Sequence, residues 1–191
     1  MIKAVETVQF ALLTTFQEVN AWFDQDGKVR AYRPQDGGWT IDEILEHIAL
    51  TNHYLLILID KGKRKALKRK GEVDLNSMLN DYAFNSEKLV NIGNHQSFWC
   101  VRPEHMEPQG GKDSTEVKST IKEQARQCIE VLQDLSSGEG ILYKTTMSVD
   151  NLGKLDVYEY IYFLAQHARR HVAQMRSNKR EYLNNENYGS K

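Results

Sequence analysis

The sequence has 191 residues, of which 40% are hydrophobic and 27% charged, with twelve glycines and three prolines. This is the composition of one soluble globular domain, and it excludes a disordered or fibrous chain. The formal net charge of −1 gives no overall attraction to nucleic acids or anionic membranes, and no apolar run approaches the roughly 20 residues that cross a bilayer.

The N-terminal segment is predicted to form a helix of about 24 residues, because its apolar residues recur at three- and four-residue steps. These residues are Val5, Val8, Leu12, Leu13, Phe16, Val19 and Phe23. Glu6 and Gln9 interrupt what would be the apolar core of a secretion signal. Two distant cysteines, Cys100 and Cys128, give no disulfide framework. We therefore expect a cytoplasmic protein.

The second helix has the clearest start in the sequence. Thr40 can cap it, and Glu43 three residues later can complete a capping box. Its apolar stripe continues to a predicted end near residues 61–64. The basic run at 61–70 is interpreted as solvated cations after the helix end, because a net charge near zero does not favour a nucleic-acid surface.

The rest of the chain contains a long connection and two further long helices. Residues 71–113 resemble an insertion, with a shorter helix in the first part and an extended piece around 98–108. A third long helix starts near Asp113 and stops at the glycines around 138–140. Residues 141–147 could be extended, the fourth helix covers about 155–178, and residues 181–191 are expected to form a frayed tail.

Four long amphipathic helices predict an all-α fold, a four-helix bundle that forms a single domain over residues 1–191. The connection between the second and third helices, about 45–50 residues, is much longer than a tight bundle turn. It is long enough to run back along the bundle, so these two helices could lie parallel.

Three histidines form the candidate functional site. His167 and His171 differ by about 40° around a helix and about 6 Å along it, so both imidazoles project from one face. His47 lies on the apolar stripe of the second helix. A lone buried histidine is more often a hydrogen-bonded core residue than a ligand, but three together outweigh that interpretation. Three imidazoles with an open position are typical of a catalytic divalent-metal site.

The remaining histidines are weaker candidates. His53 lies about 240° around the helix from His47 and so is expected to face away from the site. His95 and His105 lie in the long connection, where surface histidines are common. Tyr54 and Tyr160 each lie seven residues from a predicted ligand and could bind substrate, although core packing is the simpler explanation. The sequence has no metalloprotease, phosphate-binding or serine-nucleophile motif.

The residues 38–41, Gly-Trp-Thr-Ile, followed by His47 and by the spaced set His167, His171 and Gln174, resemble the DinB/YfiT-like family of metalloenzymes. The resemblance covers nearly the whole chain. It implies an up-down-down-up bundle, a nickel or zinc ion held by the three histidines, and a homodimer. Some members of that family are thiol-dependent S-transferases or isomerases that use bacillithiol, mycothiol or glutathione.

Two functions are therefore expected as alternatives. The first is a metal-dependent enzyme, a thiol-dependent S-transferase or a hydrolase, acting on a small-molecule substrate that could be a low-molecular-weight thiol. The second is a non-catalytic helical bundle that binds a metal ion or another ligand. Neither nucleic acid nor a membrane is expected as a partner.

Overall fold

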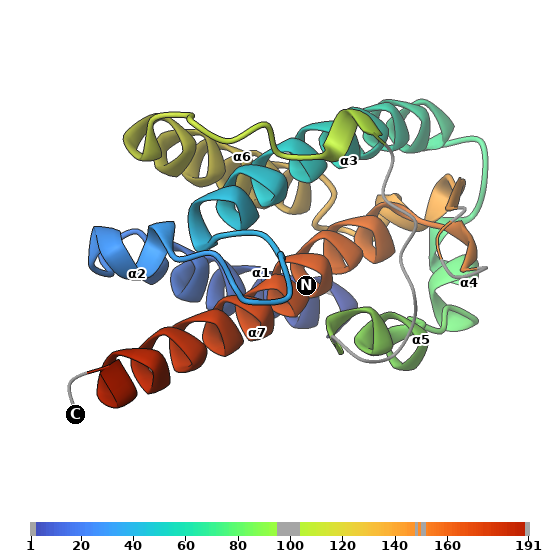
Figure 1. Ribbon diagram of the computed structural model, residues 1–191. Coiled ribbons are helices and arrows are strands. Elements are labelled where there is room, and N and C mark those ends of the chain that lie inside the picture. Colours follow the sequence, from blue (N-terminus) through green and yellow to red (C-terminus); the bar gives the residue numbers. More distant parts are fainter. Residues whose placement is uncertain (1–2, 95–103, 148, 150–151, 190–191) are drawn as a thin grey trace.

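The computed structural model describes residues 3–94, 104–147, 149 and 152–189. His95, Cys100 and the first part of the predicted extended piece lie outside these residues. The described chain is mostly helical, as predicted, and four long helices dominate it (Figure 1). They are α1 (Lys3–Trp22), α3 (Ile41–Arg69), α6 (Ser114–Asp134) and α7 (Val157–Gly189). None of the described helices is both long and apolar enough to span a membrane.

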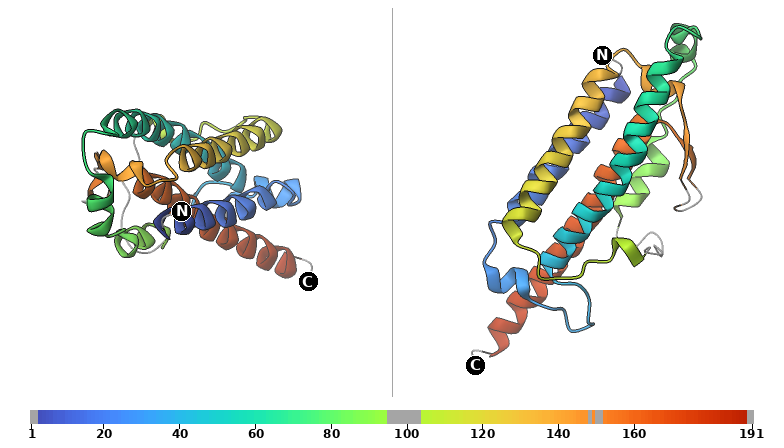
Figure 2. Two further views of the ribbon diagram at one scale, coloured as in Figure 1. Left: turned by 180° about the vertical axis from the view of Figure 1, so that it is seen from behind. Right: turned by 90° about the horizontal axis from the view of Figure 1, so that it is seen from above.

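The long helices surround one apolar core. Helix α1 packs along α7 and α6, and α3 packs against both α6 and α7 (Figure 2). Most of the apolar residues predicted for these helices face inward, and buried residues from all four helices form a continuous cluster. Leu13 was predicted to lie on the buried stripe of α1, but it is 54% exposed. The contact between α3 and α7 brings together the two helices that carry the candidate ligands.

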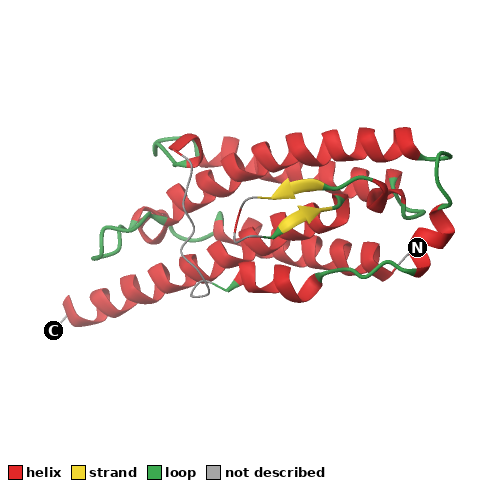
Figure 3. Cartoon of the chain, turned by 90° about the vertical axis from the view of Figure 1, so that its right-hand side faces the viewer, coloured by secondary structure: helices red, strands yellow, loops and turns green. Residues whose placement is uncertain are grey.

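Short elements join the long helices. They are α2 (Gly27–Ala31), α4 (Leu75–Asn80), α5 (Ser86–Val90), the 3-10 helices η1 (Asn91–Gly93), η2 (Glu104–Met106) and η3 (Glu139–Leu142), and the strands β1 (Thr145–Met147) and β2 (Gly153–Leu155). The strands pair antiparallel and form the only sheet in the described part of the chain (Figure 3). Of the predicted extended piece at 141–147, only residues 145–147 form a strand. In the second predicted extended piece, at 98–108, the described residues 104–106 form a 3-10 helix instead.

Two helices are longer than predicted. Helix α3 runs through the basic segment to Arg69, since Lys and Arg are good helix formers and are favourable near a helix C-terminus. Helix α7 continues past Asn178 to Gly189, so the prediction of a frayed tail was wrong for residues 181–189. The Glu181 carboxylate accepts hydrogen bonds from the Tyr32 hydroxyl (2.7 Å) and the Gln35 amide (2.8 Å). These contacts hold the extension against the segment after α2.

Polar side chains define where the site-bearing helices begin. The predicted capping box of α3 is confirmed: the Thr40 hydroxyl accepts the Glu43 amide, and the Glu43 carboxylate accepts the Thr40 amide. Helix α7 starts with the same reciprocal arrangement, in which Asp156 accepts the Glu159 amide (3.0 Å) and Glu159 accepts the Asp156 amide (2.9 Å). Both carboxylates of this second box are buried.

Candidate metal centre

The three predicted histidines come together between α3 and α7. One ring nitrogen from each of His47, His167 and His171 can be chosen so that all three lie within 4.8 Å of one another. The ring centroids are 4.6–5.2 Å apart. The side chains are only 3%, 8% and 7% exposed, respectively. The sequence prediction that these rings share one buried location is therefore correct.

Local helix geometry explains this convergence. His47 lies between Ile44 and Ile48 on the buried face of α3, and both isoleucines are fully buried. His167 and His171 follow one another by a single turn on the inner face of α7. Because α3 packs against α7, the third ring meets the other two across the interface.

Hydrogen bonds place a proton on Nδ1 of two rings. Nδ1 of His47 lies 2.7 Å from the backbone carbonyl oxygen of Met106, and a carbonyl can only accept, so Nδ1 carries the proton. Nδ1 of His171 likewise donates to Oε1 of Gln174, at 3.0 Å. When such a ring is neutral, its unprotonated nitrogen is Nε2, and this is the form of a histidine that binds a metal ion.

The surroundings of the third ring favour its neutral form. Burial, followed by the neighbouring rings of His171 and His47, lowers the pKa of His167 well below its ordinary value. Its Nδ1 is buried without a hydrogen-bond partner, and its Nε2 lies 3.2 Å from Nε2 of His171. Two nitrogens bound to one ion at about 2.0–2.1 Å would be about 3 Å apart. The donor set therefore fits a divalent metal ion.

Comparison with protein families supports the same conclusion. The family model described as the DinB superfamily matches residues 12–175, a span that contains all three histidines. The chain belongs to the DinB superfamily. Searches of curated proteins and of solved structures found no significant match. Membership of the DinB superfamily and the histidine cluster together fit a metal-binding protein.

Mostly apolar groups surround the cluster in this DinB-superfamily chain. The Trp39 ring lies 4.8 Å from the His47 ring, and the Phe163 ring stacks on His167 at 6.5 Å between centroids. The Thr51 hydroxyl is 3.5 Å from Nε2 of His47. Among the described residues, no aspartate, glutamate or cysteine joins the three-histidine group. The group could thus hold an ion through imidazoles alone, with positions left for other ligands.

The other described histidines do not join the three-histidine group. His53 and His105 are exposed, and both of their rings contact the Tyr54 ring, at 5.2 and 4.4 Å between centroids. His95 is outside the described residues. The Tyr160 hydroxyl donates to a backbone carbonyl of β1 at 2.9 Å, so it is a core residue with a satisfied hydroxyl.

Two supporting groups were not identified from the sequence. The backbone carbonyl of Met106 accepts the proton of His47, and any residue type could supply such a carbonyl. Its segment also has no apolar periodicity, so nothing in the sequence predicted this contact. The buried Glu46 was also missed, because glutamate on a helix is expected to face solvent. Gln174 could have been given its role, since it follows His171 by three residues on the same helix face.

Proposed function

We propose that this protein is a metal-dependent enzyme that holds one divalent ion through Nε2 of His47, His167 and His171. The observation that supports the proposal is the convergence of three buried imidazoles. Two of them donate their other ring proton to an oxygen, which orients the ring as in established metal sites.

Nickel and zinc are the proposed ions. Imidazole suits both, whereas magnesium and calcium prefer oxygen ligands, and none of the three groups supplies oxygen. A divalent ion with an open position lowers the pKa of a bound water or thiol, which makes a nucleophile at neutral pH. The Thr51 hydroxyl, beside Nε2 of His47, is placed to hydrogen-bond a group that binds there.

The proposed reaction is S-transfer or hydrolysis of a small molecule, with a low-molecular-weight thiol as the preferred nucleophile in the first case. The support is that Cys128 is buried and that burial raises its pKa to about 12, so its thiol is not a neutral-pH nucleophile. Cys128 is the only cysteine in the described part of the chain, and we propose that the nucleophile comes from solution.

A non-catalytic metal-binding bundle is the second candidate, because all three imidazoles are at least nine-tenths buried. The two candidates differ in whether the bound ion has an exchangeable water. Cobalt-substituted protein tests this by water-proton relaxation. Fast exchange supports the enzyme, whereas a site closed to solvent supports the binding protein.

The finer architecture is also a proposal. We propose a single domain over residues 1–191 with up-down-down-up winding, supported by the pairing of α1 with α7 and of α3 with α6, and by the long segment between α3 and α6 (Figure 2).

We further propose a cytoplasmic homodimer. Phe10 and Leu13 on α1 are 73% and 54% exposed, and a second copy would cover such apolar side chains. The molecular mass in solution, with Phe10→Glu as the variant, tests the dimer.

Metal analysis of protein purified without a histidine tag tests the main proposal. We expect one nickel or zinc ion per chain and a higher melting temperature when the ion is added to metal-free protein. His167→Ala should lose both effects, whereas His53→Ala, which changes an exposed histidine on α3, should keep them. Absence of both a bound ion and a thermal shift in the wild type would contradict the proposal.

A further inference from the structure

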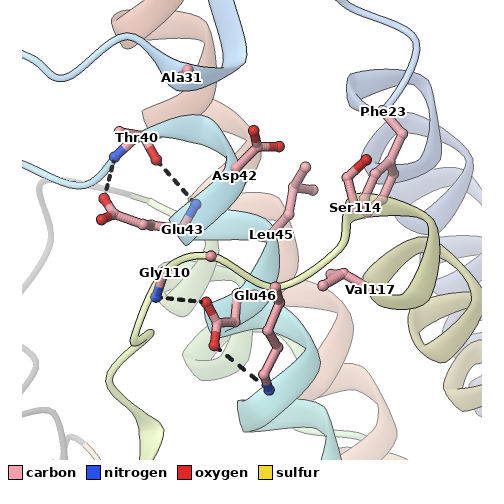
Figure 4. Close-up of a pocket in the computed structure, with 12 residues that line it drawn as sticks. Phe23, Ala31, Thr40, Asp42, Glu43, Leu45, Glu46, Gly110, Ser114 and Val117 are labelled. Atoms are coloured by element: carbon pink, nitrogen blue, oxygen red, sulfur yellow. Dashed lines mark hydrogen bonds and ion pairs between the residues drawn. The ribbon is translucent and has the colours of Figure 1, made fainter. Parts of the chain in front are cut away.

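Glu46 is a buried carboxylate next to the candidate ligand His47, and it is only 3% exposed. Its Oε2 accepts the Gly110 amide at 3.0 Å (Figure 4). Its Oε1 lies 3.4 Å from the Gln109 amide and 3.5 Å from Nζ of Lys112. All of these partners belong to one short segment. We call residues 104–112 the strap.

The strap also touches the histidine cluster. Its Met106 carbonyl accepts the Nδ1 proton of His47 at 2.7 Å. Its His105 ring packs on Tyr54 of α3 at 4.4 Å between centroids, and Sδ of Met106 lies 4.0 Å from the Thr51 hydroxyl. The strap thus crosses α3 beside the site, with Glu46 holding one end and His47 contacting the other.

The backbone of the strap is shaped for the Glu46 contact. Gly110 and Gly111 have φ angles of +73° and +80°, in the left-handed region that favours glycine. This turn directs the Gly110 amide at the carboxylate. A buried carboxylate that accepts backbone amides forms charge-assisted hydrogen bonds, which are stronger than neutral ones.

We infer that Glu46 is a positioning residue: it anchors the strap so that the Met106 carbonyl fixes the orientation and the Nδ1–H tautomer of His47. The contacts of Glu46 described above are with the backbone of the strap and with Lys112. Its effect on metal affinity rests on the proposed function. Its effect on the His47 tautomer does not, because the hydrogen bond joins two groups of the protein itself.

The adjoining cavity determines which variant is informative. A cavity of about 160 Å³ lies beside Glu46 and is lined also by Thr40, Glu43 and Gly110 (Figure 4). In Glu46→Ala, water can enter the enlarged cavity and hydrate the released amides, so the strap loses its anchor. Glu46→Gln keeps one acceptor oxygen but loses the charge, and it should have an intermediate effect.

The first experiment uses metal-free protein labelled with 15N-histidine. In the wild type we expect His47 to be a single Nδ1–H tautomer, and the Gly110 amide to be protected from hydrogen exchange. In Glu46→Ala we expect a mixture of tautomers and at least about tenfold faster exchange at Gly110. The matched control is Asp60→Asn, an exposed carboxylate on the same helix that pairs with Arg64.

A second variant covers the case in which Glu46→Ala does not fold. Gly110→Ala strains the left-handed turn without a steric clash, since the nearest side-chain atom would be 3.6 Å from the added Cβ. It should reproduce the mixed tautomers. In either variant, faster hydrogen exchange of the backbone amide at position 110 would show that the strap has lost its anchor. If His47 nevertheless keeps the tautomer that it has in Asp60→Asn, the inference is wrong.

The second experiment measures zinc dissociation constants by competition with a chromophoric chelator. We expect Glu46→Ala to weaken zinc binding by about tenfold, in the range known for groups that orient metal ligands, and Asp60→Asn to have no effect. Equal zinc affinity in the wild type and Glu46→Ala overturns the inference. If the wild type itself binds no zinc, the proposed function fails, and the tautomer comparison alone decides the role of Glu46.

Discussion

Asp156, the buried cap of α7, should make the stability of the protein fall as the pH rises toward neutrality. Burial, followed by the charge of Glu159, raises the pKa of Asp156 from 3.8 to about 7. The folded protein therefore keeps the Asp156 proton up to about pH 7, whereas the unfolded chain releases it near pH 4. Between these values unfolding releases a proton, so the free energy of unfolding decreases with rising pH.

The size of the effect follows from the two pKa values. The pKa of Asp156 in the folded protein is higher than its ordinary pKa by about 3. This difference corresponds to an added cost of about 4 kcal/mol for ionising Asp156 in the folded protein. Asp156→Asn removes the titrating group, while its side-chain oxygen can still accept the Glu159 amide. Relative to the wild type, we expect this variant to gain about 2–4 kcal/mol between pH 4.5 and pH 8.

Urea unfolding followed by circular dichroism at pH 4.5, 6 and 8 provides the measurement. The difference between the variant and the wild type is the quantity to compare, because groups common to both proteins cancel. Asp60→Asn, which changes an exposed carboxylate, is the matched control variant. A pH-independent difference for Asp156→Asn would show that the carboxyl of Asp156 titrates normally and would refute the reasoning.

Three further outcomes are expected from local contacts. Thr40→Ala removes the hydroxyl that accepts the Glu43 amide and should lower the unfolding free energy by about 1 kcal/mol, whereas Thr40→Ser should retain it; urea unfolding distinguishes them. Tyr158→Phe leaves two buried backbone groups without their hydroxyl partner and should cost about 1–3 kcal/mol; a loss below the error of urea unfolding would contradict this. The Cys128 thiol, whose pKa burial raises to about 12, should react with maleimide only on unfolding, as mapped by mass spectrometry; rapid labelling of the native protein would disprove its burial.

The features predicted correctly from the sequence are those that short-range geometry determines. The Thr40–Glu43 capping box is a contact across three residues, and it forms as expected. The pairing of His167 with His171 follows from helical spacing. The prediction that His47 joins this pair was also correct, because the apolar stripe of its helix indicated which face is buried.

The features that were missed depend on distant partners. The Met106 carbonyl meets a ring 59 positions away, and no periodicity in its segment predicts the contact. The extension of α7 depends on a contact between Glu181 and Tyr32, which overrides the polar composition that suggested a tail. Glu46 is buried because a remote segment supplies its hydrogen bonds, and the helix pattern alone places glutamate in solvent.

The division of the site between α3 and α7 has a consequence for biosynthesis. His47 emerges from the ribosome long before His167 and His171, and its ring contacts with these two residues join positions 120 or more residues apart. Until α7 has been made, one inner face of α3 and most of the inner face of α1 lack their packing partner. The last long helix therefore completes the core and the histidine cluster in one step. A nascent chain arrested before α7 would expose apolar surface that chaperones can bind.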